Sequence, residues 1–118
     1  MKNFDLEERL IDFSVLIIGI VNSMPNNKAG STLSGQLVRS GTSVSLNYGE
    51  ARGSESKKDF IHKMQVVLKE LRESYICLKI IYKSRIYENE NLIIQALEEN
   101  NELISIFVKS VETARKNS

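Results

Sequence analysis

The first long apolar repeat of the chain reads LEERLIDFSVLIIGIVNSM and occupies residues 6–24. One set of its apolar residues advances by four and three positions in turn: Leu6, Leu10, Phe13, Ile17, Ile20 and Met24. This spacing places them on one face of an α-helix that packs against other helices. The repeat predicts a helix over about residues 5–23, which ends before Pro25 because a proline disfavours helical geometry in the preceding residue.

The same segment carries a second apolar stripe, formed by Ile11, Val15 and Ile18. On a helical wheel this stripe lies roughly opposite the first one. A single bundle cannot bury both faces of one helix, and an apolar stripe left in water marks an interaction surface. We therefore predict that Ile11, Val15 and Ile18 lie in an interface between subunits.

Residues 31–50 form the second predicted helix, with apolar residues at helical spacing and Ser31 or Thr32 as its N-cap. The segment is a poor helix by intrinsic propensity, because each of its glycines costs about 1 kcal/mol relative to alanine. Gly41, Ser45 and Gly49 recur every four residues and form a smooth ridge. This ridge predicts the close approach of another helix, from the same chain or from a neighbouring copy.

Two longer amphipathic segments complete the chain. Ser56 and Asp59 have the serine-to-acid spacing of a capping box, and helical apolar spacing continues to about Lys83. After a loop at residues 84–91, a fourth helix covers about residues 92–115, with Asn100 and Asn101 as its weakest point. No segment alternates like a strand. Residues 1–118 are therefore predicted to form a single all-α domain, an antiparallel up-down-up-down four-helix bundle.

Composition narrows the class of protein. A content of 42% hydrophobic and 26% charged residues is typical of a globular protein and not of a disordered one. Cys77 is the only cysteine, which excludes an intramolecular disulfide and favours a reducing compartment. The amino end is acidic, unlike a signal peptide, and the apolar run at residues 13–21 is too short to cross a bilayer. We expect a cytoplasmic protein that does not enter a membrane.

Residues with catalytic chemistry are few. The single histidine, His62, cannot build a multi-histidine metal site within one chain, and the Glu-x-x-His pattern of di-iron bundles is absent. Cys77 is flanked by apolar residues, which indicates a buried thiol and not a nucleophile. The segment from Gly30 to Gly35 has the glycine spacing of a phosphate-binding loop but lacks its lysine. We predict a protein that is not an enzyme and holds no metal or other cofactor.

Charge is unevenly distributed along the chain. The net charge is −1 for residues 1–50, +5 for residues 51–85 and −3 for residues 86–118. The basic segment would present a phosphate-facing surface if several copies gathered around a ring. Acidic residues are interspersed at pairing distance, so an ordinary solvated helix face explains the same pattern. The sequence leaves both interpretations open.

Several stretches closely resemble a known bacterial family. They are LVRSGTSVSLNYGEAR (residues 37–52), ESKKDFIHKM (residues 55–64), VLKELRESY (residues 67–75) and ELISIFV (residues 102–108). The family is that of the four-helix bundle proteins first noticed as products of intervening sequences in large-subunit ribosomal RNA genes. The resemblance implies a left-handed antiparallel bundle that assembles into a homopentameric ring.

The resemblance also implies partners. A related branch, the accessory variability proteins of diversity-generating retroelements, is similar in fold and binds nucleic acid and a reverse transcriptase through a basic ring surface. That branch is strongly basic, whereas this chain has a net charge of +1. The basic segment and the likeness together give these candidate nucleic-acid-binding residues: Arg39, Arg52, Lys57, Lys58 and Lys63.

Asn47 and Glu50 match a polar signature of the family and lie three residues apart on one helix face. We interpret them as structural residues that bond to the third helix or to a neighbouring subunit. Two hypotheses about function follow. The first is a non-catalytic oligomeric scaffold that contacts RNA, DNA or a nucleic-acid-processing protein through the basic residues. The alternative is an adaptor that binds a protein partner and has no nucleic-acid role.

Overall fold

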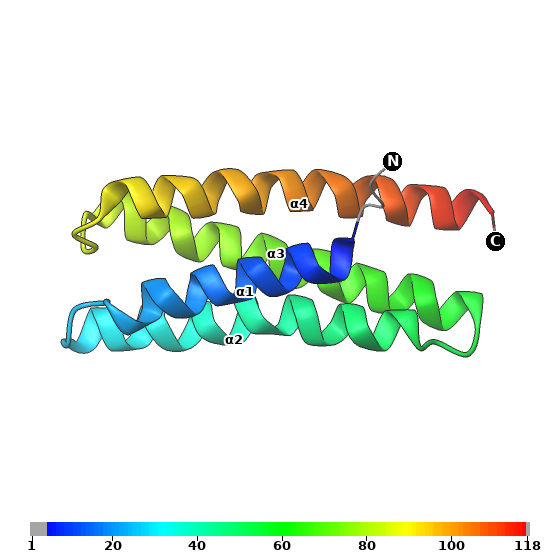
Figure 1. Ribbon diagram of the computed structural model, residues 1–118, viewed down its shortest axis with the longest axis horizontal. Helices are drawn as coiled ribbons and strands as arrows, with labels where there is room; N and C mark the ends of the chain where they lie inside the picture. Colours follow the sequence, from blue (N-terminus) through cyan, green and yellow to red (C-terminus); the bar gives the residue numbers. More distant parts are fainter. Residues whose placement is uncertain (1–4, 118) are drawn as a thin grey trace.

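Four α-helices make up most of residues 5–117, the part of the chain that the computed structural model describes (Figure 1). They are α1 (Leu6–Asn22), α2 (Lys28–Arg52), α3 (Lys57–Ser84) and α4 (Glu90–Lys116). Successive helices run in opposite directions through short connections, and residues 5–117 contain no β-strand. The prediction of an all-α, antiparallel up-down-up-down bundle is confirmed.

Each helix begins at a side chain that caps it. Asp5, Asn27, Ser56 and Asn89 each accept a hydrogen bond from the backbone N–H three residues later, at 2.8–3.1 Å. Such a bond satisfies one of the backbone donors that the first turn of a helix leaves without a partner. The cap predicted at Ser56 is confirmed.

The predicted starts of α2 and α4 were wrong by two or three residues. α2 begins at Lys28, because Asn27 caps it directly after the turn at Pro25. Gly30 makes this early start possible: a Cβ atom there would lie 2.0 Å from the Pro25 carbonyl oxygen. α4 likewise begins two residues early, at Glu90, since an asparagine precedes it. Cap chemistry, and not the apolar repeat, sets both boundaries.

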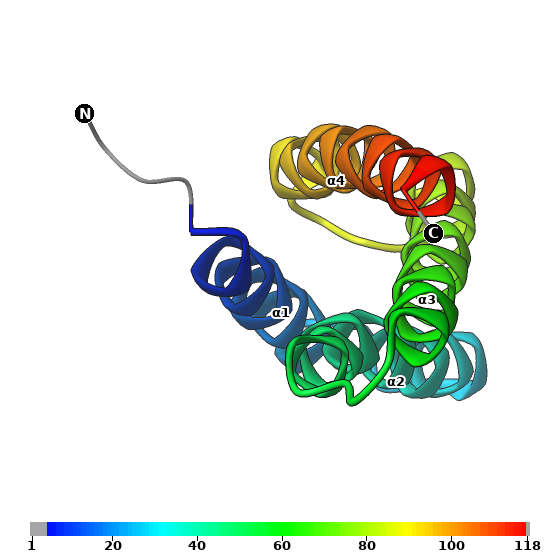
Figure 2. The ribbon, with the colours of Figure 1, turned by 90° about the vertical axis from the view of Figure 1, so that its right-hand side faces the viewer.

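The helices follow one another around the bundle in chain order (Figure 2). α2 packs on α1 and α3, α3 packs on α4, and the contact between α1 and α4 is smaller. The core side chains with less than 2% exposure include Phe13, Leu37, Leu71 and Phe107. α1 has 17 residues and α2 has 25, so α1 is roughly 12 Å shorter at about 1.5 Å per residue.

α1 and α2 approach closely at Gly41. A Cβ atom on Gly41 would lie 2.8 Å from Cγ2 of Ile17, and Ser14 Oγ donates to the Gly41 carbonyl oxygen at 2.8 Å. The hydroxyl groups of Ser14 and Ser45 are hydrogen-bonded to each other at 2.7 Å. The predicted ridge thus receives α1 at two of its members, whereas the third, Gly49, has open space where a Cβ atom would lie.

Asn100 is a fully buried polar residue in the middle of α4. Its amide fits with Nδ2 donating to the Leu71 carbonyl oxygen at 3.0 Å and Oδ1 accepting from the Tyr75 N–H at 3.1 Å. These two backbone groups belong to residues four apart in α3, which an α-helix pairs with each other, so the amide adds to that backbone bond. The residue predicted as a weak point of α4 therefore joins that helix to its neighbour.

Candidate interaction surfaces

Three apolar side chains of α1 are exposed in the single chain and form what we call the α1 face. Their exposed fractions are 38% for Ile11, 60% for Val15 and 41% for Ile18. They are exposed because the core takes up only the opposite side of α1, where Phe13 and Ile17 are buried. The structure thus leaves the predicted interface residues accessible, and their burial between subunits stays a prediction.

Leu46 of α2 adds a further exposed apolar residue, with 69% of its surface in water. Ser14 bonds to Ser45 across the α1–α2 contact, so the next residues along each helix, Val15 and Leu46, stand at a similar level of the bundle. The sequence analysis missed Leu46. It lies off the stripe that holds Leu37 and Val44, and a single leucine outside a repeat gives no periodic signal.

The outer side of α3 carries a second apolar surface, also missed from the sequence. Ile76 and Ile80, one turn apart, have exposed fractions of 58% and 48%, and we call this pair the α3 face. It lies on the opposite side of the helix from the buried Leu71 and Leu78. Exposed basic residues accompany it: Lys69, Arg72, Lys79 and Lys83. The available signal was a pair of isoleucines four residues apart that the core stripe does not include.

Most of the predicted nucleic-acid-binding cations are engaged within the chain. Arg39 pairs with Glu70 and Glu73 of α3. Arg52 pairs with Glu7 of α1 at 2.5 Å. Two other predicted cations bond to α2 and to the end of α4: Lys63 Nζ lies 2.6 Å from Glu50, and Lys57 Nζ donates to the Asn117 carbonyl oxygen at 3.0 Å. Each of these side chains thus bonds across to a neighbouring helix or its end within the chain.

The five predicted cations do not form one cluster. Arg39 lies in the middle of α2, whereas Arg52, Lys57, Lys58 and Lys63 gather where α2 connects to α3. Lys58 is exposed there and lines a hollow of about 440 Å³ together with Lys57, Ile61, His62, Gln65 and Arg115. Four of the five predicted cations therefore lie at this end of the bundle, and Arg39 lies apart from them.

The predicted structural residues Asn47 and Glu50 behave differently from each other. Glu50 reaches across to Lys63 of α3, and this hydrogen bond raises the pKa of the Lys63 ammonium. The Asn47 amide donates to the Ser43 carbonyl oxygen of its own helix at 2.9 Å. Of the two, only Glu50 is seen to link helices among residues 5–117.

The single thiol of the chain lies in the core. Cys77 is buried, its Sγ lies 3.6 Å from the Leu33 carbonyl oxygen, and burial raises the pKa of its thiol. A raised pKa keeps the thiol protonated and weakens it as a nucleophile.

Within residues 5–117, no three histidine, cysteine, aspartate or glutamate side chains are grouped to hold a metal ion. In the same region, no helix is long and apolar enough to span a membrane.

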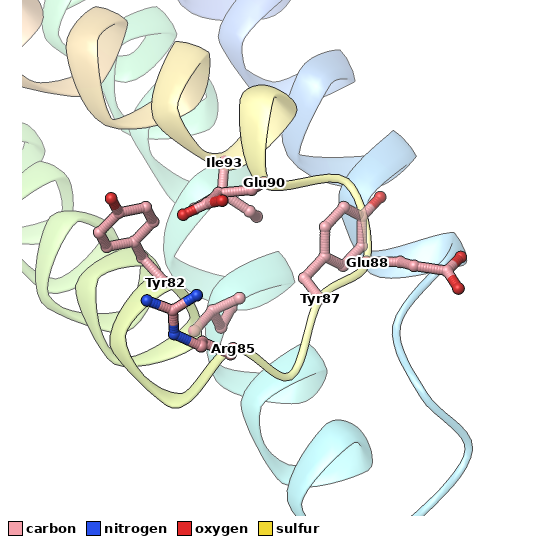
Figure 3. A pocket seen from close by; sticks show the side chains of 7 residues that line it. Tyr82, Arg85, Tyr87, Glu88, Glu90 and Ile93 are labelled. Carbon is pink, nitrogen blue, oxygen red and sulfur yellow. The ribbon is translucent and has the colours of Figure 1, made fainter.

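A cavity of about 230 Å³ lies where α3 turns into α4 (Figure 3). Arg85 ends α3 in the left-handed conformation, with φ 57°, which turns the chain toward α4. In Figure 3 the Arg85 guanidinium stands near Tyr82, Glu90 lies across from them, and Glu88 points away from the cavity. Its lining holds no serine, cysteine or histidine, so it lacks the usual nucleophiles and the commonest general base.

A shallower groove of about 570 Å³ lies beside the start of α1, where the short helix leaves α3 and α4 partly uncovered. Leu6, Tyr48, Phe60 and Ile106 supply its apolar lining. The Tyr48 ring meets Phe107 edge-on, with centroids 5.7 Å apart, and burial raises the pKa of its hydroxyl. Tyr48 thus turns toward the core.

A family model described as 23S rRNA-intervening sequence protein matches residues 2–109. The chain belongs to this family. The match confirms the resemblance drawn from the sequence and extends from before α1 into the last helix. The family is of unknown function and is not a recognised enzyme family. A search of the curated proteins found no match.

Among solved structures, the chain is similar to a crystal structure from Bacteroides thetaiotaomicron. That structure is described as a protein of unknown function from the S23 ribosomal protein family. The two chains superpose with a TM-score of 0.83 at 24% identity, over 91% of this chain and 98% of the other. At this level of identity the likeness supports the four-helix fold alone.

Proposed function

We propose that the protein is a non-catalytic scaffold whose working unit is an assembly of several copies. The observation that carries this proposal is the exposure of the α1 face on a helix whose other side is fully used by the core. Removing apolar surface from water contributes about 25 cal/mol per Å², so a stripe of three large side chains favours association. The resemblance to the intervening-sequence family supports a closed ring, with five copies as the proposed number.

Three glycines add independent support. Each glycine inside a helix costs about 1 kcal/mol relative to alanine, so its presence needs a packing reason. Gly30 and Gly41 have one, because a Cβ atom would collide with Pro25 or Ile17. Gly19, Gly35 and Gly49 have open space at the Cβ position within the chain. A neighbouring copy that approaches α1 and α2 closely would supply the missing reason.

Sedimentation of the full chain tests the assembly. We expect the wild-type protein to sediment as a multi-subunit species at micromolar concentration. Val15→Lys should sediment as a monomer, with a far-UV circular dichroism spectrum that matches the wild type. Asn101→Lys, at an exposed position of α4, is the matched control and should assemble normally. A wild-type protein that stays monomeric at this concentration would rule out the scaffold.

A second candidate activity is the binding of nucleic acid at the end of the bundle where α2 meets α3. Lys58 is exposed there beside Lys57 and Arg115, and the surrounding segment, residues 51–85, has a net charge of +5. We expect single-stranded RNA to bind at low salt and to be released as salt rises, because phosphate contacts displace counterions. Lys58→Glu should weaken binding, whereas Lys28→Glu, at the start of α2, should not.

The adaptor function is the alternative, in which the assembly binds a protein and no nucleic acid. The internal ion pairs of Arg39, Arg52 and Lys63 favour it, since these cations already have carboxylate partners. Capture of a protein partner that survives nuclease treatment would support it, and so would a flat titration with RNA and DNA.

The single buried thiol, Cys77, fits a reducing compartment such as the cytoplasm.

A further inference from the structure

The α1 face and the α3 face lie on helices that do not touch each other. Contacts join α1 to α2 and α4, and α3 to α2 and α4, with no contact between α1 and α3. Figure 2 shows α2 between them. One copy of the chain therefore presents two separate apolar surfaces, and neither can cover the other within that copy.

The two faces also carry opposite charges. On α1, Glu8 and Asp12 are exposed, while the helix's one basic residue, Arg9, reaches toward α4 and pairs with Glu99 and Glu102 at 2.7 Å. The exposed charge of α1 is thus negative. Its first-turn acid Glu7 is half-buried and pairs with Arg52.

The surroundings of the α3 face are positive. Four exposed basic residues accompany Ile76 and Ile80 along the outer side of the helix: Lys69, Arg72, Lys79 and Lys83. The acids of this part of α3, Glu70 and Glu73, point toward α2 and pair with Arg39. Lys79 is exposed, and its ammonium stands over the Tyr75 ring of the same helix, 5.7 Å from the ring centroid.

We infer that the α1 face of one copy packs against the α3 face of the next copy. The inference rests on the proposed scaffold function and names the two surfaces that form its interface. Two different patches that match each other make a head-to-tail contact, which closes into a ring when the rotation between copies allows it. A self-matching contact between two α1 faces would instead leave the α3 face in water.

A mixing experiment tests the pairing directly. Val15→Lys puts a cation on the α1 face, and Ile76→Glu puts an anion on the α3 face, so each variant opposes its partner surface. Both replace a β-branched residue at an exposed helical site by a better helix former, so the fold is retained. Each variant alone should be monomeric, and an equimolar mixture should contain mixed oligomers by native mass spectrometry, since one intact face of each kind is present.

The outcomes separate this inference from the proposed function. A monomeric wild-type protein would overturn the scaffold itself. If the wild type assembles and Ile76→Glu assembles equally well, the scaffold stands and the α3 face is not the partner surface. Normal assembly of Val15→Lys, or two monomeric variants that fail to combine, would overturn the pairing as well.

Charge reversal gives a second measurement. Arg72→Glu with Lys83→Glu should raise the dissociation constant of the assembly by about tenfold or more, equivalent to roughly 1.4 kcal/mol. Adding Glu8→Lys and Asp12→Lys to the same chain should restore assembly, because the charges are then exchanged across every contact. The same four changes leaving the assembly as weak as the two alone would contradict the charge match.

Discussion

Gly41 lies where α1 crosses α2, and Asn100 lies where α4 meets α3. Neither residue is a good helix former, but each makes a close contact with the neighbouring helix that a better helix former could not make. At Gly41 the missing side chain lets Ile17 and Ser14 reach the α2 backbone. At Asn100 a side-chain amide bonds to two backbone groups of α3. At the scale of the residue, these two helix contacts depend on residues with low helix propensity.

Gly41→Ala should therefore destabilise the bundle despite its better helix propensity. The new Cβ must displace Ile17, which costs about 1–3 kcal/mol and outweighs a gain of about 1 kcal/mol. Gly35→Ala, with open space at the Cβ position, is the matched control and should be stabilising. Urea unfolding of both changes in the monomeric Val15→Lys background measures the difference, and equal stabilisation by the two alanines would contradict the close approach.

Asn100→Asp should lower the free energy of unfolding by about 3 kcal/mol or more at neutral pH. The substitution keeps the size of the side chain but replaces the donor to Leu71 by an oxygen and buries a charge.

The loss should shrink as the pH falls. Burial raises the folded-state pKa of the new carboxyl above its unfolded value of about 4, so the protonated form stabilises the fold. That contribution is fully present below the unfolded pKa and is lost as the pH rises through the folded pKa. The difference in unfolding free energy from wild type, measured from pH 7 downward, should narrow. A constant difference would argue against a buried, ionised carboxylate.

At the scale of the element, the four helices follow from their apolar repeats, and their ends follow from caps. The repeat at Leu6, Leu10 and Phe13 identifies a buried helix face because core packing requires that spacing. The start of α2 escaped prediction because Asn27 and Pro25 lie outside any repeat. The α3 face was not predicted because the apolar repeat of a helix identifies the face that packs in the core. Two isoleucines on the opposite side are too few to form a repeat of their own.

Asn27→Ala should destabilise the chain by about 1 kcal/mol. The substitution removes the side-chain oxygen that accepts from the Gly30 N–H at 2.8 Å, and it leaves that backbone donor without its cap. Asn26→Ala, one residue earlier in the same exposed turn, is the control and should have little effect. The midpoints of urea unfolding compare them, and equal midpoints would show that the cap is unimportant.

At the scale of the whole molecule, surface chemistry carries more information about function than the core does. The α1 face was predictable because its three residues repeat on one helix, whereas its suggested partner required knowing which side of α3 faces outward. The predicted cations could be selected by charge, but their pairing with Glu7, Glu50 or Glu70 depends on how distant helices are placed. The sequence thus identifies an exposed apolar or charged helix face, whereas the residues that it contacts are known only from the fold.

Added salt should weaken the assembly if attraction between opposite charges contributes to the contacts between copies. Raising the ionic strength with sodium chloride from about 0.1 M to about 1 M shortens the screening length from about 10 Å to about 3 Å, so the dissociation constant should rise. A variant with Arg72→Gln and Lys83→Gln has fewer charges to screen and should respond less. Sedimentation across this series measures both slopes, and a wild-type constant that does not change with salt would contradict the charge match.

The amide of Asn100 has a consequence for alignment. Two smooth apolar helices can slide past each other by a turn and still bury leucine against leucine. Sliding α4 along α3 would carry Asn100 away from Leu71 and Tyr75 and leave its amide buried among apolar side chains without partners. One polar residue thus selects a single register from several that the apolar stripes alone would permit, and so keeps the outer surfaces of every copy identical.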